Sequence, residues 1–204
     1  MIKIVKKVRT LANRGFTLLE LMVSIGIMLV ILSVILFSHR QFSDSLIITN
    51  LAYEVALSIR QSQTYGFSVK GVVDNGAQTF DAGYGVHFDG ANNLSSYQLF
   101  ADKNNNKIYD SDDINLETFN LERGSVVENI CIISEGDCDV ASGVVDIVFV
   151  RPNPDAFIRV GGGNTNEQGL VIKLRSSNGM NRCVELMNTG QISIKNCVSG
   201  EVVE

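Results

Sequence analysis

The chain has 204 residues, and its 22 acidic side chains outnumber its 17 Lys and Arg residues to give a formal net charge of −5. It contains only two histidines and none of the serine-hydrolase, zinc-protease, P-loop or dinucleotide-binding motifs. The composition therefore argues against an enzyme, and the acidic balance argues against a general affinity for nucleic acid.

A basic leader opens the chain. Residues 1–15 contain no acid and five basic side chains, which are Lys3, Lys6, Lys7, Arg9 and Arg14. Without this leader, 12 basic side chains remain against 22 acidic ones, so the rest of the chain has a charge near −10. We expect the leader to stay in the cytoplasm by the positive-inside rule and everything after Phe37 to lie outside it.

An apolar segment follows the leader. Leu21–Phe37 is 17 residues without a charge, and counting from Phe16 gives 22 residues in which Glu20 is the single charged side chain. About 20 helical residues span the roughly 30 Å of membrane hydrocarbon. A secretory signal would be cut after its apolar region, but LFSHRQF offers no small-residue cleavage site. A plain anchor would not need Glu20, because a carboxylate costs about 2.5–3.5 kcal/mol at a helix centre and less near its end.

The sequence Gly-Phe-Thr-Leu-Leu-Glu between the leader and the apolar segment resembles the type IV prepilin signal. In that family, a membrane-embedded prepilin peptidase cuts after the glycine and methylates the new N-terminus. The resemblance implies cleavage between Gly15 and Phe16, with Phe16 N-methylated. Glu20 then stands where the family has the glutamate that pairs with a neighbouring subunit's N-terminal amine during assembly. The resemblance is strong over residues 14–37 and weaker beyond them.

Residues 38–66 continue the helical pattern but become amphipathic. Apolar residues recur at Leu46/Ile47, Leu51, Val55 and Leu57/Ile59, with polar residues between them. No proline occurs before Pro152, so we expect one helix of roughly 50 residues that ends at Gly66. The chain is thus organised as a cleaved leader (1–15), a transmembrane and assembly helix (16–37), an amphipathic helix (38–66) and a β-rich head (67–204).

Short alternating segments separated by turns fill the head, which predicts antiparallel strands. Val144–Val150 is the most apolar of them, and we expect it to be central. His87 has no acidic or nucleophilic motif beside it, so we expect a surface or hydrogen-bonded residue. Together with the helix, this pattern predicts an α+β, pilin-like fold in which the second half of the helix packs on antiparallel sheets.

Residues 102–113 (DKNNNKIYDSDD) follow the spacing of a calcium loop of the EF-hand kind. Side-chain or carbonyl oxygens fall on the ligand positions at Asp102, Asn104, Asn106, Ile108 (carbonyl), Asp110 and Asp113. Two departures matter: Lys107 replaces the usual glycine, which costs about 1–2 kcal/mol in a left-handed backbone, and Asp113 replaces the usual glutamate. The alternative is an ordinary Asn/Asp-rich surface turn. A similar segment is common in H-type pseudopilins, where it can be purely structural.

All four cysteines lie in the exported part, where an even number favours disulfides. A three-residue hairpin loop at Thr189-Gly190-Gln191 would pair Leu186 with Ile194, and by the same register Cys183 with Cys197. This register predicts the Cys183–Cys197 bond and leaves Cys131–Cys138, while the other two connectivities remain open.

The expected function is that of a structural subunit, a pseudopilin or minor pilin of a type II secretion pseudopilus or a type IV pilus. Its partners would be the prepilin peptidase, membrane lipid and other pilin subunits, in the cytoplasmic (inner) membrane before assembly. The head is most similar to H-type pseudopilins and their FimT-like relatives. The alternative is a FimT-like DNA-binding minor pilin, with Lys173, Arg175 and Lys195 on one face of the C-terminal sheet. The acidic tail SGEVVE and the charge near −10 argue against nucleic acid.

Overall fold

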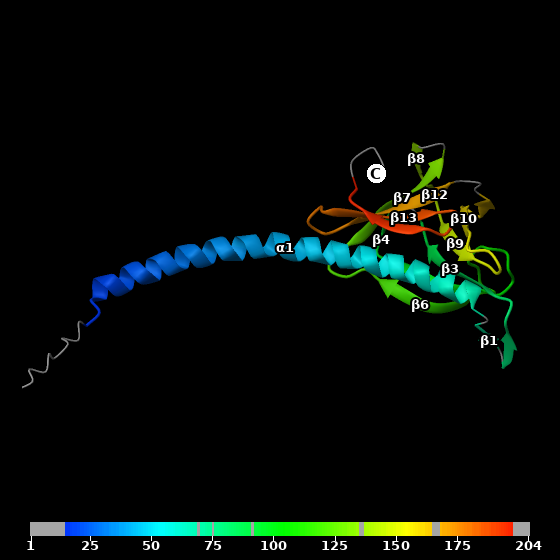
Figure 1. Ribbon diagram of the computed structural model, residues 1–204, viewed down its shortest axis with the longest axis horizontal. Coiled ribbons are helices and arrows are strands. Elements are labelled where there is room, and N and C mark those ends of the chain that lie inside the picture. Colours follow the sequence, from blue (N-terminus) through cyan, green and yellow to red (C-terminus); the bar gives the residue numbers. More distant parts are fainter. Residues whose placement is uncertain are drawn as a thin grey trace, which may run out of the picture. The chain divides into compact units, whose positions relative to one another are not determined.

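A computed structural model describes residues 15–68, 70–74, 76–90, 92–134, 137–164 and 168–197 of the protein (Figure 1). The chain divides into two units, with the boundary between Phe42 and Ser43. Helix α1 (Leu18–Phe67) is 50 residues long and belongs to both units. The expectation of one long helix is therefore confirmed.

The head half of α1 buries one face. Its buried apolar residues follow helical spacing at Ile48, Leu51, Ala52, Val55 and Ile59. Leu46, Tyr53 and Leu57, in contrast, are exposed by 47%, 62% and 66%. Leu46 and Leu57 belong to the apolar pattern of the sequence, but they lie on the exposed side of the helix. Leu57 is two residues from both Val55 and Ile59, which puts it on nearly the opposite side of the helix.

The strands of the head form a short hairpin and two larger sheets. The hairpin pairs β1 (Val72–Asp74) with β2 (Ala77–Thr79). The first sheet has six antiparallel strands in the order β11-β10-β9-β3-β5-β6. Their bounds are β3 (Gly83–Phe88), β5 (Ser96–Asp102), β6 (Ile114–Asn120), β9 (Val145–Phe149), β10 (Ala156–Val160) and β11 (Gly163–Asn164).

The second sheet is also antiparallel, in the order β14-β13-β12-β7-β4, with β8 paired to β7. Its strands are β4 (Asn92–Leu94), β7 (Val126–Ser134), β8 (Asp137–Val140), β12 (Gly169–Arg175), β13 (Asn181–Met187) and β14 (Ile192–Lys195). Strand β4 lies between β3 and β5 in the chain but pairs in the other sheet, so the chain crosses between the sheets rather than following one meander.

One main core joins α1 to both sheets. Ile48 and Val55 of the helix share it with Phe149 of the first sheet and Ile172 of the second. Strand β9 is buried at all five positions and lies between β10 and β3. Its predicted central place is therefore correct. The result is an α+β fold of the pilin-like kind, with the head half of α1 packed on antiparallel sheets.

The register of the last hairpin differs from the expected one. Leu186 pairs with Ile192, and Val184 with Ile194, so the three-residue loop is Asn188-Thr189-Gly190. Gly190 has a φ of 82°, a left-handed conformation that glycine adopts without strain. The loop therefore ends at Gly190, whereas the expected loop had Gly190 in its middle. As a result, the partner of each β13 residue moves by two residues along β14.

The structure contains two disulfides, Cys131–Cys138 and Cys183–Cys197, with Cα–Cα distances of 5.4 and 5.3 Å. Neither bond joins directly paired residues. Cys183 is paired with Lys195, two residues before Cys197, and Cys131 is paired with Val140, two residues after Cys138. Because a shift of two residues keeps side chains on the same face of a strand, the bond between Cys183 and Cys197 survives the change of register.

Candidate functional site

The segment around the Gly15–Phe16 peptide bond precedes the helix. Residues 15–17 are not helical, and Phe16 is 72% exposed. Among the described residues, no heavy atom lies within 4 Å of a Cβ built on Gly15. The peptide bond that the prepilin resemblance marks for cleavage therefore lies in irregular backbone and not inside the helix.

Thr17 caps the N-terminus of α1. Its Oγ1 accepts a hydrogen bond from the Glu20 backbone N–H at 3.3 Å, and its carbonyl accepts the first helical bond from Leu21 at 3.1 Å. Thr-Leu-Leu-Glu has the residue types of a capping box, in which the side chain at the cap and the glutamate three residues later mark the helix start. The cap explains why the helix begins at Leu18 and not at Phe16.

Glu20 is exposed in the first turn of the helix. Within the described part of the chain, no ion pair or side-chain hydrogen bond involves its carboxylate. The helix N-terminus favours a negative charge by roughly 0.3–1 kcal/mol at exposed sites, which only partly offsets the cost of a carboxylate in hydrocarbon. Its environment leaves the carboxylate available to a cationic group of another molecule.

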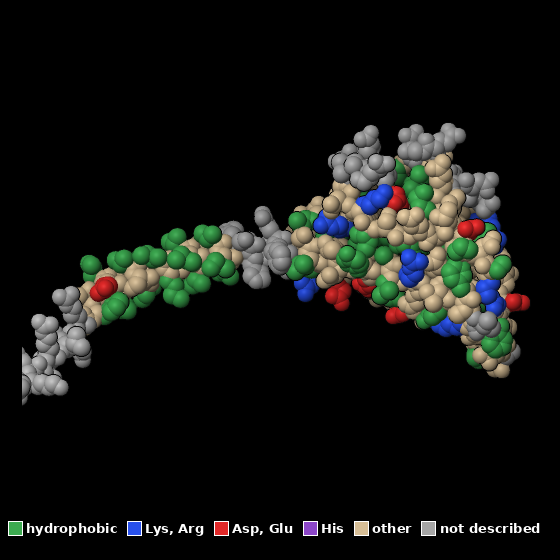
Figure 2. All heavy atoms as spheres, viewed as in Figure 1, with side chains coloured by type: hydrophobic (Ala, Val, Ile, Leu, Met, Phe, Trp, Pro, Cys, Tyr) green, Lys and Arg blue, Asp and Glu red, His purple; other side chains and the backbone are tan. Residues whose placement is uncertain are grey.

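The helix around Glu20 is long and apolar enough to cross a membrane. The candidate span is Leu18–Leu36, with a mean hydropathy of 2.7 and none of its residues buried. Hydrophobic side chains cover this part of α1 in Figure 2. The hydroxyl of Ser33 donates to the carbonyl of Val30 at 2.7 Å, so this polar group is satisfied within the helix. The span is therefore compatible with lipid, apart from Glu20.

The loop over residues 103–113, called the Asp102 loop after the residue at its base, connects two neighbouring strands of the first sheet. Asp102 is the last residue of β5, and Asp113 immediately precedes β6. Because Ala101 pairs with Ile114, the next position along the register places Asp102 across from Asp113. The strand pairing therefore brings the first and last positions of the expected calcium loop together.

Asp102 is fully buried, and its carboxylate is directed into the loop. Its Oδ2 accepts a hydrogen bond from the Lys107 backbone N–H at 2.9 Å, whereas its Oδ1 has no hydrogen-bond partner. Burial raises the pKa of Asp102, and the nearby charge of Asp110 adds to this increase, while bonds from backbone N–H groups of the loop oppose it. An unpartnered buried carboxylate oxygen is costly, so this one calls for a cation or a donor.

The other expected ligands lie along the same loop. Amide nitrogens of Asn104 and Asn106 both donate to Asp110 Oδ2, at 3.1 and 2.6 Å. Asp113 accepts the N–H of Lys103 through Oδ1 at 2.9 Å and that of Asp110 through Oδ2 at 3.0 Å. Burial raises the pKa of Asp113, and the charges of Asp102 and Asp110 contribute. Among the described residues, no three His, Cys, Asp or Glu side chains could hold a metal by themselves, so amide and carbonyl oxygens would have to complete any site.

Lys107 adopts the backbone expected of the glycine that it replaces. Its φ is 66°, and Asn105 also has a positive φ of 59°. The ammonium of Lys107 lies over the ring of Phe157 in β10, 3.7 Å from its centroid. The positive charge of Lys107 therefore makes a cation–π contact with strand β10.

Aromatic contacts hold the middle of the loop against the sheet. The ring of Tyr109 lies 4.5 Å from the ring of His87 and 5.0 Å from that of Phe100, measured between centroids. His87 is buried, and its Nδ1 lies 2.7 Å from Oδ1 of the buried Asp146. His87 is thus hydrogen-bonded, as one of its two expected roles required, but it is not a surface residue. The sequence carried no signal for its partner, because Asp146 is 59 residues away.

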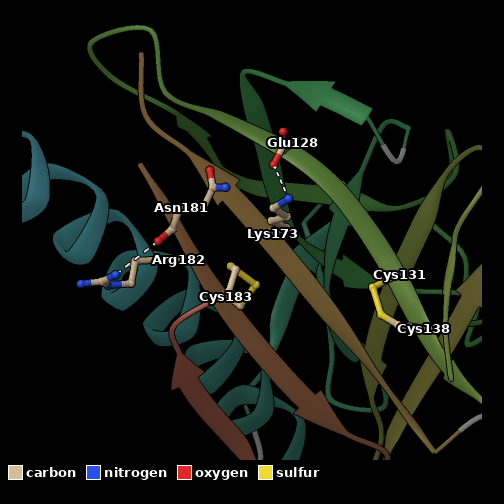
Figure 3. The surroundings of a disulfide bond; sticks show 8 residues. Glu128, Cys131, Cys138, Lys173, Asn181, Arg182 and Cys183 are labelled. Atoms are coloured by element: carbon tan, nitrogen blue, oxygen red, sulfur yellow. Dashed lines mark hydrogen bonds and ion pairs between the residues drawn. A yellow bond between two sulfur atoms is a disulfide. The ribbon is translucent and has the colours of Figure 1, made fainter. Parts of the chain in front are cut away.

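The basic residues of the second sheet are paired with acids. Lys173 and Arg175 lie 2.9 and 3.3 Å from the carboxylate of Glu128, and Lys195 lies 3.0 Å from that of Glu185. Figure 3 shows the pair of Lys173 and Glu128. These three cations share a face, as the strand pattern predicted, but their charges are largely neutralised there.

The comparison with protein families matches residues 11–36 to the prokaryotic N-terminal methylation motif. Searches of curated proteins and of solved structures found no match. The motif belongs to structural subunits rather than to enzymes, and the matched residues contain Gly15, Phe16, Glu20 and the whole candidate span Leu18–Leu36. The chain therefore carries, over residues 11–36, the N-terminal methylation motif of type IV pilin-like proteins.

Proposed function

We propose that this chain is a structural subunit of a helical filament, namely a pseudopilin or a minor pilin. The prepilin peptidase removes the leader between Gly15 and Phe16 and methylates Phe16. Before assembly, the subunit is a single-pass protein of the inner membrane, with its N-terminus in the cytoplasm and its head outside. The methylation motif over residues 11–36 and the apolar helix that follows Gly15 support this proposal.

The position of Glu20 is the observation that carries the proposal. It is the only charged side chain in the candidate span Leu18–Leu36, and it is exposed. After cleavage, the new amine of Phe16 on a neighbouring subunit is a cation of the right kind to pair with it. Pairing compensates two charges in hydrocarbon and defines the axial offset between subunits. Head-to-tail contacts of this kind do not close on themselves, so they generate a filament.

The experiment replaces Glu20 with Leu in cells that depend on the filament. Filament formation or secretion should be lost, while the processed subunit still accumulates in the membrane. Ser33→Ala is the matched control, because it also removes a polar group from the span but leaves the Glu20 charge in place. Normal filaments from Glu20→Leu would contradict the charge-pairing mechanism.

The processing step has its own test. Mass spectrometry of the subunit from wild-type cells should find a chain that begins with methylated Phe16. Gly15→Val should leave the leader attached, since the added side chain stands next to the bond that is cut. Removal of the leader from the valine variant at the wild-type rate would show that the cleavage site lies elsewhere.

Within this class, we place the chain first in a type II secretion pseudopilus and second in a type IV pilus. The resemblance of the β-rich head and the Asp102 loop, in sequence, to H-type pseudopilins and FimT-like proteins supports this order. Deleting the gene should block export of a secreted protein in the first case. In the second case, it should instead abolish surface pili or their functions.

A FimT-like DNA-binding role is the alternative. It needs a concentrated basic surface, because affinity for phosphate comes from clustered Lys and Arg. The ion pairs of Lys173 and Arg175 with Glu128 argue against it. A gel shift with the full chain in detergent at low salt should show no salt-sensitive retention of DNA, and retention would favour the alternative.

A further inference from the structure

We propose that residues 102–113 form a calcium site whose central ligand is Asp102. The coordinating oxygens are those of Asp102, Asn104, Asn106, Asp110 and Asp113, together with the carbonyl of Ile108. This site is independent of filament assembly, so it can be tested on the isolated chain.

The buried carboxylate of Asp102 is the first argument. The residue is 0% exposed, and Oδ1 has no hydrogen-bond partner although Oδ2 accepts the Lys107 N–H from within the loop. A Cβ built on Gly83, the residue paired with Asp102, would lie 3.4 Å from Oδ2. The carboxylate therefore lies close to Gly83 of β3 at the base of the loop, with one oxygen lacking the partner that a buried charge requires.

The positions of the remaining oxygens are the second argument. Register places Asp113 across from Asp102, so positions 1 and 12 of the loop meet at its base. Side chains of Asn104 and Asn106 converge on Asp110, where their amide nitrogens share Oδ2. The side-chain oxygen of Asn104 accepts the Asn106 N–H and that of Asn106 accepts the Ile108 N–H, so each oxygen keeps a second lone pair for a hard cation.

The placement of Lys107 is the third argument. Its backbone has the left-handed conformation that the glycine of such a loop supplies, and its ammonium contacts the Phe157 ring at 3.7 Å. The substitution that appeared to oppose calcium therefore preserves the turn and directs its charge to a different strand. The proposed ligands are then carboxylate, amide and carbonyl oxygens, with no amine among them.

Calcium fits these ligands better than magnesium or zinc. Calcium takes six to eight oxygen ligands in flexible geometry, whereas magnesium requires a near-ideal octahedron and keeps several waters. Zinc prefers nitrogen and sulfur ligands, and neither histidine nor cysteine lies among residues 102–113. Loops of this kind in extracellular modules bind with a Kd of about 10⁻⁴–10⁻³ M.

Calcium binding is tested on the full chain with intact disulfides, purified in detergent and stripped with a chelator. Titration with CaCl₂ should give one bound ion per chain, and excess calcium should raise the melting temperature. Asp102→Asn and Asp113→Asn should weaken binding by at least about tenfold. Asp112→Asn is the matched control, because Asp112 is an exposed carboxylate of the same loop outside the ligand positions, and it should bind like the wild type.

Asp102→Asn affects a buried residue, so Asp110→Asn, at a side chain nearer the surface, provides a second test if the first variant fails to fold.

Terbium luminescence shows where the ion binds. Because Tyr109 lies in the loop, terbium emission excited through tyrosine should fall strongly in Tyr109→Phe while calcium still binds. The absence of a calcium-dependent change in the wild type would overturn the proposal. Unchanged calcium binding by both Asp102→Asn and Asp110→Asn would also overturn it. So would an equal rise in the melting temperature of the wild type with MgCl₂.

Discussion

The ammonium of Lys107 lies 3.7 Å from the centroid of the Phe157 ring, and the residue that carries it has a φ of 66°. The Asp102 loop and strand β10 are thus joined by a cation–π contact that starts from a strained backbone position. The backbone strain at Lys107 lowers the stability of the fold, whereas its cation–π contact raises it. Substitutions at Lys107 can therefore measure the two effects separately.

Lys107→Ala should destabilise the fold by about 0.5–1 kcal/mol, because it removes the cation–π contact and keeps the left-handed backbone. Lys107→Gly should be more stable than Lys107→Ala by about 1 kcal/mol, since glycine relieves the strain. Urea unfolding of the oxidised chain measures both free energies. Equal stability of the two variants would show that φ at this position carries no strain.

Replacing Cys183 and Cys197 with serine should cost about 3 kcal/mol, because the bond closes a chain segment of 14 residues. The same change at Cys131 and Cys138 should cost slightly less, about 2.5 kcal/mol, since its separation is 7 residues. Urea unfolding with and without reductant measures the two effects. In reductant, the free energy of unfolding of the wild type should fall by the sum of the two effects. If replacing one cysteine pair with serine leaves the stability unchanged, the corresponding disulfide does not form in the exported protein.

Tyr97 and Ser58 form a buried hydrogen bond with an oxygen–oxygen distance of 3.0 Å. The Ser58 hydroxyl donates to the Glu54 carbonyl, so Tyr97 must donate to Ser58. Burial raises the pKa of Tyr97 far above its ordinary value, which keeps it a protonated donor. Tyr97→Phe should therefore cost about 1 kcal/mol, and Ser58→Ala more, about 1–3 kcal/mol, because it leaves the buried tyrosine hydroxyl without an acceptor.

Unfolding of the two single variants and the double variant measures this pair. The double variant should be less destabilised than the sum of the single variants, since the phenylalanine ring that replaces Tyr97 has no hydroxyl that requires an acceptor. Strict additivity would contradict a direct bond between the two hydroxyls.

Glu54 lines a pocket together with Glu122 and Arg123. Burial, followed by the charges of Glu122 and Glu117, raises the pKa of Glu54. A raised carboxyl pKa means that the folded state holds the proton more tightly than the unfolded state. The ionised form therefore costs stability above the folded pKa, and this cost disappears as the pH falls.

Glu54→Gln should accordingly raise the melting temperature at pH 7, and the gain should shrink toward pH 4. The effect should be small, roughly 0.5 kcal/mol or less, because Glu54 is largely exposed to solvent. Asp89→Asn, a change at an exposed carboxylate, is the control for the loss of one negative charge. A gain for Glu54→Gln that persists unchanged at pH 4 would assign the effect to packing and not to charge.

Local patterns predicted the helix and the strands of this protein well. The absence of proline before Pro152 and the uncharged residues from Leu21 onward were sufficient for one long helix with an apolar first half. They were not sufficient to separate the buried from the exposed apolar residues of its second half, where Leu57 belongs to the apolar pattern but is exposed. Hydrophobicity alone does not distinguish a core face from an apolar stripe that is left on the surface.

The last hairpin shows where local reasoning ends. The strands and the loop length were predicted correctly, but the register was displaced by two residues, because the backbone conformation of Gly190 decides which residues form the loop. The disulfide depends only on which face its cysteines occupy, and a shift of two residues does not change that face. The disulfide follows from the alternation of side chains along the strands and was therefore predictable. The register follows from one backbone dihedral angle and was not.

The sequence by itself determined the cleavage motif, the apolar helix with Glu20 and the oxygen spacing of residues 102–113, because each depends on residues close together in the chain. Only the tertiary structure decided which groups meet across strands. It placed Lys107 over Phe157 instead of over the loop, paired Lys173 with Glu128, and buried Asp102 with one oxygen unpartnered. These contacts depend on strand order and register, which arise from packing the whole head around one core.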